Sequence, residues 1–108
     1  MTGNAVRALR EHLHLSAVTL AALLHVSPST VGRWEARGAE DSQAEGVAAA
    51  LLYALHDATL RVDATTLRSQ LTSAMRRNGA LAAVYYLLSV ALDDAFPARP
   101  ERAVPVSE

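Results

Sequence analysis

Apolar residues recur along most of the chain at spacings of three and four, which is typical of helices with one buried face. In the first of these segments, residues 4–13, Val6, Leu9 and Leu13 share a face while most charges lie elsewhere. The same spacing predicts five further helices, over residues 17–24, 28–37, 43–56, 64–78 and 80–96. Alanine and leucine dominate the sequence, and 51% of its 108 residues are hydrophobic. We therefore expect an all-α fold.

Residues suited to helix ends lie at the predicted boundaries. Ser16, Ser27 and Asp63 are placed to cap the second, third and fifth helices, because their side-chain oxygens accept from free amide groups. Pro28 follows Ser27 at a first helical position, where a missing amide hydrogen costs nothing. Either Asp41 or Ser42 is expected to cap the fourth helix. Gly38 and Gly79 are expected to end the third and fifth helices, and His25-Val26 to form the turn between the second and third.

The fourth helix is expected to turn Val47, Leu51 and Leu55 inward, with Leu52 beside them. We divide the chain into a first domain, residues 1–60, and a C-terminal helical hairpin, residues 61–96. Prolines then interrupt regular structure in residues 97–108, which we expect to be a disordered tail.

The amino-acid composition excludes some kinds of site and disfavours some classes of protein. The sequence has no cysteine, which excludes disulfides and thiolate metal sites. It begins without a secretory signal, and its longest apolar run, residues 80–88, is too short for a bilayer, so we expect a cytoplasmic protein with no membrane association. The formal net charge is −1, but residues 1–38 carry +2. This modest asymmetry favours a nucleic-acid partner for the N-terminal half.

Residues 17–36 have the pattern of two short helices that cross steeply. Ala21 is small enough for the backbones to approach. The apolar residues spaced to face the crossing are Leu20, Leu24, Val26, Val31 and Trp34. The outer face of the second of these helices is left with Pro28, Ser29, Gly32, Arg33 and Ala36. A helix with such small exposed residues fits closely into a DNA major groove.

The segment from Val6 to about Leu55 resembles the helix-turn-helix family of phage Cro and CI repressors, the XRE family. The resemblance rests on Val-Arg-Ala-Leu-Arg-Glu, on Ala-Ala-Leu-Leu-His-Val-Ser-Pro-Ser-Thr-Val and on Arg-Trp-Glu-Ala-Arg-Gly. It implies a lambda-repressor-like domain of four or five helices whose third helix reads bases, and an ion pair between Arg10 and Glu35. Two positions depart from the family. Ala17 replaces a glutamine that holds a phosphate, and His25 replaces a turn glycine at the cost of modest strain.

We predict DNA contacts from Ser27, Pro28, Ser29, Thr30, Gly32, Arg33, Arg37 and Gln43. Arg33 is expected to bind guanine, the commonest specific contact, with a phosphate contact or a solvated side chain as alternatives. Ser27 and Thr30 either donate to phosphates or have only structural roles, as a helix cap and a residue of the helix surface. Arg37 is a candidate for phosphate or a plain surface charge, and Gln43 is placed near the start of the fourth helix, where phosphates bind.

The sixth predicted helix is apolar nearly all round, so a chain of this size has too little protein to cover it. We predict that it forms a two-fold dimer through Leu81, Val84, Tyr85, Leu88 and Leu92. The alternative is that it completes one larger monomeric core.

Together these features predict a homodimeric repressor that binds an inverted repeat in double-stranded DNA. One alternative is an antitoxin-like protein whose C-terminal helices bind a protein partner, and another is a DNA-organising protein of weak specificity. We expect no enzymatic activity, no cofactor and no metal, because the four histidines belong to separate elements or faces and no nucleophile motif is present. Those histidines are His12, His14, His25 and His56.

Overall fold

The computed structural model describes residues 1–95, with side chains as far as Ala91. The predicted tail, Phe96 and the side chain of Leu92 lie outside this range. Residues 1–95 form six helices and no strand: α1 (Gly3–His12), α2 (Ala17–Leu24), α3 (Pro28–Ala36), α4 (Gly46–Thr59), α5 (Ala64–Asn78) and α6 (Ala80–Ala95). The all-α expectation is confirmed, and the predicted bounds of α2 and α5 agree with the structure. No helix in this part of the chain has the length and apolar character needed to cross a membrane.

Side-chain caps fix where four of the helices begin. The side chains of Ser16, Ser27 and Asp63 accept from amide groups three residues later, at 3.0, 3.2 and 3.0 Å. These three predicted caps are confirmed. Thr2 caps α1 in the same way, with Oγ1 3.0 Å from the amide nitrogen of Ala5, so this helix begins one residue before the predicted start. Each bond satisfies an amide group that has no partner inside its helix.

The fourth helix begins later than predicted, and neither Asp41 nor Ser42 caps it. Asp41 Oδ2 instead accepts from the amide of Gln43 at 2.9 Å, and Ser42 Oγ from the amide of Ala44 at 3.3 Å. Gln43 has φ +68° and Gly46 has φ +62°, so the backbone turns once in the loop and again at the first residue of α4. Short polar side chains that bond to the backbone two residues on favour turns over helices, which explains the error.

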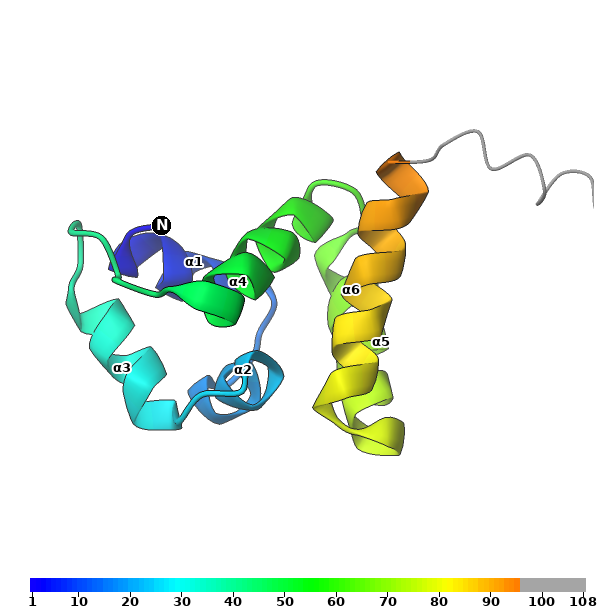
Figure 1. Cartoon of the computed structure of the whole chain (residues 1–108), viewed down its shortest axis with the longest axis horizontal. Coiled ribbons are helices and arrows are strands. Elements are labelled where there is room, and N and C mark those ends of the chain that lie inside the picture. The colour runs from blue at the N-terminus through cyan, green and yellow to red at the C-terminus, as the bar shows by residue number, and fades with distance from the viewer. Residues whose placement is uncertain (96–108) are drawn as a thin grey trace, which may run out of the picture.

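Helices α1 to α4 form a compact group at one end of the molecule, and α5 and α6 lie side by side at the other (Figure 1). α6 packs against both α2 and α4, so the hydrophobic core continues across the predicted boundary at residue 60. Leu51, Leu52 and Leu55 of α4 are buried as expected. Val47 was wrongly placed on this face. It is 71% exposed because the later start of α4 puts it in the first turn, outside the core.

The start of the chain fastens α1 to the end of α3. The amide groups of Gly3 and Asn4 donate to the carbonyls of Glu40 and Gly38, at 3.0 and 2.8 Å. Gly3 is buried, and a Cβ there would lie 2.3 Å from the carbonyl oxygen of Trp34. Only glycine permits so close an approach of two backbones. The C-terminal end of α3 is therefore held against the start of α1.

Candidate nucleic-acid interface

The turn between α2 and α3 has the tight geometry that its residue pattern predicts. His25 ends α2 in the left-handed region, at φ 60° and ψ 42°. Its neighbour Val26 donates its amide to the carbonyl of Ala21 at 3.0 Å. Ala21 is 1% exposed, which matches its expected place where the two helices cross. The predicted turn and its positive φ at a histidine are thus confirmed, and they set α3 steeply against α2.

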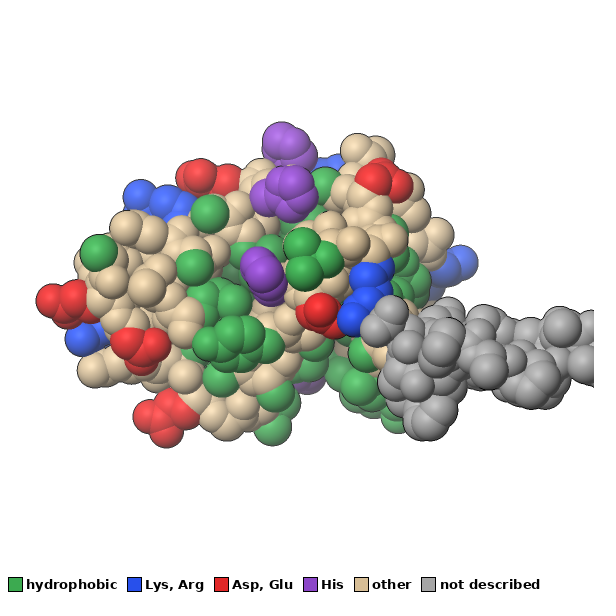
Figure 2. Space-filling view, turned by 90° about the horizontal axis from the view of Figure 1, so that it is seen from above, with side chains coloured by type: hydrophobic (Ala, Val, Ile, Leu, Met, Phe, Trp, Pro, Cys, Tyr) green, Lys and Arg blue, Asp and Glu red, His purple; other side chains and the backbone are tan. Residues whose placement is uncertain are grey.

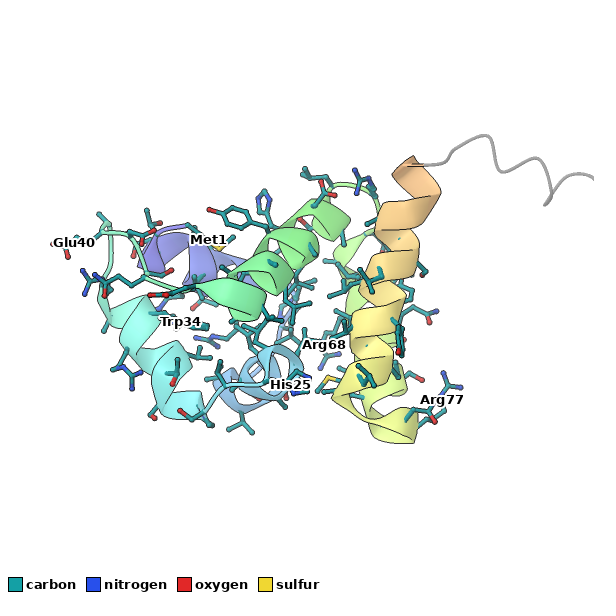
Figure 3. The ribbon with its side chains drawn as sticks, viewed as in Figure 1. Met1, His25, Trp34, Glu40, Arg68 and Arg77 are labelled. Carbon is teal, nitrogen blue, oxygen red and sulfur yellow. The ribbon has the colours of Figure 1, made fainter. Side chains whose placement is uncertain are left out.

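One face of α3 is buried in the domain. Val31, Trp34 and Glu35 are each at most 7% exposed. Figure 3 shows Trp34 on the side of α3 that faces the other helices. Trp34 therefore belongs to the core, as its spacing among the apolar residues predicts.

The opposite face of α3 is open to solvent. Its exposed residues are those expected from the sequence: Pro28, Ser29, Gly32, Arg33 and Ala36. No atom outside the local helix lies within 4 Å of the place where a Cβ on Gly32 would stand. The outer face is therefore flat apart from one long side chain, that of Arg33.

The polar residues near the start of α3 bond mainly to one another. Ser27 Oγ lies 3.0 Å from Ser29 Oγ and 2.9 Å from Thr30 Oγ1. Arg33 Nη2 lies 3.4 Å from Thr30 Oγ1, which is a long hydrogen bond. Most N–H groups of the Arg33 guanidinium are therefore available to bind another molecule. Ser27 Oγ, in contrast, already accepts from the amide of Thr30 as the cap of α3.

An ion pair with a buried carboxylate holds α3 to α1. Arg10 donates to both carboxylate oxygens of Glu35, from Nε to Oε2 at 2.7 Å and from Nη2 to Oε1 at 3.0 Å. Arg10 also donates to the carbonyl of Leu15 at 3.2 Å, and Arg7 Nε lies 3.4 Å from Glu35 Oε1. The hydrogen bonds from Arg10 hold the pKa of Glu35 below its usual value, against the opposing effect of burial.

The loop after α3 brings the last two predicted DNA contacts together. Arg37, the C-cap residue of α3, donates from Nε to the carbonyl of Asp41 at 2.6 Å and from Nη2 to Glu40 Oε1 at 3.2 Å. Gln43 lies near the start of α4, as the sequence suggested, but in the loop three residues before it and not within the helix. Both residues line a shallow hollow of about 250 Å³ that also includes Arg33.

An apolar face of α6 is uncovered among the described residues. Ala83 and Leu87 are buried against the other helices, whereas Leu81, Tyr85 and Leu88 are 55%, 62% and 48% exposed. These three, with half-buried Val84, occupy one side of α6 at helical spacing. The helix that the sequence shows as apolar nearly all round thus has one apolar face in the core and another exposed to solvent.

Three features of this region were not predicted from the sequence. Arg7 precedes Arg10 by one helical turn, so its place beside Glu35 follows from spacing that was available in the sequence. The close approach at Gly3 depends on a distant segment and had no local signal. The exposed carboxylates of the loop, Glu40 and Asp41, were visible in the sequence but had no predicted position relative to α3.

Residues 6–43 match the helix-turn-helix family. This range runs from the first turn of α1 to the loop residue Gln43 and includes the whole of α2 and α3. The match and the all-helical structure confirm the resemblance to Cro/CI-type regulators and the lambda-repressor-like fold. The family is one of DNA-binding regulatory domains. No curated protein and no solved structure matches the chain significantly.

Proposed function

We propose that this chain, which carries a Cro/CI-type helix-turn-helix domain in residues 6–43, is a homodimeric, sequence-specific repressor of transcription. The observation that carries the proposal is the outer face of α3, with small exposed residues around one long donor, Arg33. A helix of this shape approaches base edges closely, and a guanidinium can donate two parallel bonds to guanine. The face therefore suits reading in the major groove.

The remaining predicted contacts act on the phosphates. Arg37 and Gln43 lie around the hollow beside α3, and the hydroxyls of Ser27 and Thr30 lie at its first turn. Contacts of this kind position a protein on the duplex without carrying sequence information. Specificity then depends mainly on Arg33 and on how closely the small residues allow α3 to enter the groove.

A second copy supplies the rest of the specificity. One reading helix covers only a few base pairs, whereas two of them, about 34 Å apart, read an inverted repeat. The uncovered face of α6 offers the surface for pairing, because Leu81, Tyr85 and Leu88 carry no charge that a two-fold contact would bring against its like. A dimer bound over a promoter blocks it, which makes repression the simplest outcome.

The proposal is tested by selection of bound duplexes from a random pool at physiological salt. The wild-type protein should enrich an inverted repeat. Arg33→Ala should lose preference at one base-pair position in each half-site, since a bidentate pair to guanine contributes about 1–3 kcal/mol of discrimination. Arg77→Ala is the matched control, because Arg77 is exposed on α5, far from α3 (Figure 3). No enriched sequence with wild-type protein, or an unchanged profile with Arg33→Ala, would count against this function.

The open face of α6 also favours a second candidate, an antitoxin-like protein that binds a different protein there. The two candidates differ in the behaviour of the purified chain. A single stable dimer in sedimentation supports the homodimer. A mixture of aggregates that resolves only with a co-expressed neighbour supports the protein-partner alternative.

A further inference from the structure

The loop that joins α3 to α4 is acidic where it borders the proposed DNA surface. Glu40 and Asp41 have side chains that are 75% and 69% exposed, and Glu45 is exposed as well. Against these three carboxylates stand two arginines, Arg33 and Arg37. Asp41 is partly engaged, since it accepts from the amide of Gln43 and lies 3.5 Å from the amino group of Met1. Glu40 has a different partner.

Glu40 pairs with an arginine that the proposed function assigns to DNA. Its Oε1 accepts from Arg37 Nη2 at 3.2 Å, while Arg37 Nε is held by the carbonyl of Asp41 at 2.6 Å. These two bonds hold the guanidinium at the edge of the hollow, and the carboxylate of Glu40 partly offsets its charge. Glu40 marks the outer limit of the molecule beyond α3 in Figure 3. Figure 2 shows acidic and basic side chains mixed at this end of the molecule.

We propose that Glu40 limits the affinity of this protein for DNA of any sequence, because it occupies Arg37 and places a negative charge where backbone phosphates approach. The inference rests on the proposed function, since it assumes that duplex DNA lies against α3. An exposed pair of this kind is weak, so a phosphate can compete for the arginine, but Glu40 must then be left unpaired beside it. Such a loop lowers the sequence-independent part of binding and leaves discrimination to the base contacts of α3.

The test measures binding to a random duplex, so it needs no known operator. Glu40→Gln should bind roughly five- to tenfold more tightly than wild type at 0.1 M salt. The slope of log affinity against log salt should steepen by up to about one per protomer, because Arg37 without its carboxylate partner makes its phosphate contact in full and releases the corresponding counterion. Asp57→Asn is the matched control. It also removes a carboxylate from a surface pair with an arginine, Arg61, but at the far end of α4. Its affinity and slope should equal those of the wild type.

A double-mutant cycle identifies Arg37 as the group that Glu40 restrains. Arg37→Gln should reduce affinity more in the Glu40→Gln background than in the wild type, where the arginine is already paired. Circular dichroism checks that each variant keeps its helices. The side chain of Glu40 can change without loss of its backbone bond to Gly3.

Where the wild type binds duplex DNA, two results would overturn the inference: a folded Glu40→Gln variant with wild-type affinity and slope, or one that binds more weakly. Failure of the proposed function looks different. In that case the wild-type protein selects no sequence or binds no duplex even at low salt, whatever the effect of Glu40→Gln. If the wild type binds nothing and Glu40→Gln gains measurable affinity, the inference is supported. If neither protein binds, it is overturned.

Discussion

Glu35 joins α3 to α1 through its bonds to two arginines of α1. It is 7% exposed and accepts from Arg10 and Arg7, and Arg10 in turn holds the carbonyl of Leu15. A buried charge that loses its partner is costly, because the remaining ion is desolvated without compensation. The bonds from the arginines therefore contribute to stability chiefly by compensating the cost of burying the Glu35 carboxylate.

We expect Glu35→Gln to lower the free energy of unfolding by about 3 kcal/mol near neutral pH, since it leaves Arg10 without its carboxylate. The pKa of Glu35 is lowered in the folded state, so its contribution is complete above the ordinary carboxyl range and is lost as pH falls through and below that range. Urea denaturation of both proteins from pH 7 to pH 3 checks this. The difference between them should shrink towards acid pH. A constant difference would contradict the role of the charge.

Gly3 and Gly32 show that the same residue type can have opposite roles. A Cβ on Gly3 would meet backbone atoms of α3 and its loop, at 2.3 Å from the Trp34 oxygen and 2.9 Å from the Gly38 nitrogen. A Cβ on Gly32 would meet nothing. Gly3→Ala should destabilise the protein by about 1–3 kcal/mol through overpacking. Gly32→Ala should stabilise it by about 0.5–1 kcal/mol through helix propensity. Thermal unfolding of the two variants and the wild type measures the change in midpoint, which should fall for Gly3→Ala and rise for Gly32→Ala. Equal changes in midpoint would contradict this explanation.

At the scale of the element, local signals predicted helices well when the cap lay next to the helix. Ser16, Ser27 and Asp63 could be found from the sequence because a cap bonds to amides only three residues away. The start of α4 could not. Asp41 and Ser42 are equally good turn residues, and the choice between cap and turn depends on contacts with the start of the chain.

The α5–α6 connection is a turn of one residue, Gly79, at φ 86° and ψ 178°. This region of backbone space is open almost only to glycine. We expect Gly79→Ala to cost about 1–3 kcal/mol of stability, measured by urea unfolding, because the strain is not offset by any new contact. Asn78→Ala is a suitable control, since it changes the exposed last residue of α5 beside this turn. Equal midpoints for the two variants would show that the hairpin can relax at this point.

At the scale of the whole molecule, the sequence suggested that α6 lacks cover, and the structure divides that helix. Ala83 and Leu87 complete a core shared with α2 and α4, which periodicity alone could not assign, because apolar residues surround most of the helix. What stays uncovered is the face of Leu81, Tyr85 and Leu88. Since α6 contacts α2 directly, a partner bound on this face would have a fixed position relative to α2 and α3.

In the proposed dimer, the oligomeric state and the DNA affinity both depend on this surface. Leu88→Glu should give a monomer in sedimentation equilibrium, because a dimer would bring two carboxylates together in an apolar contact. Binding to the selected inverted repeat should then weaken at least a hundredfold, whereas binding to a single half-site should change less than twofold, as expected when a linked second contact is lost. Leu60→Glu is the matched control, since Leu60 is 73% exposed at the end of α4 and not on α6. If Leu88→Glu stayed dimeric, the pairing surface would lie elsewhere. If it became monomeric and kept full affinity for the repeat, the two half-sites would be read independently, and the second copy would not be needed for specificity.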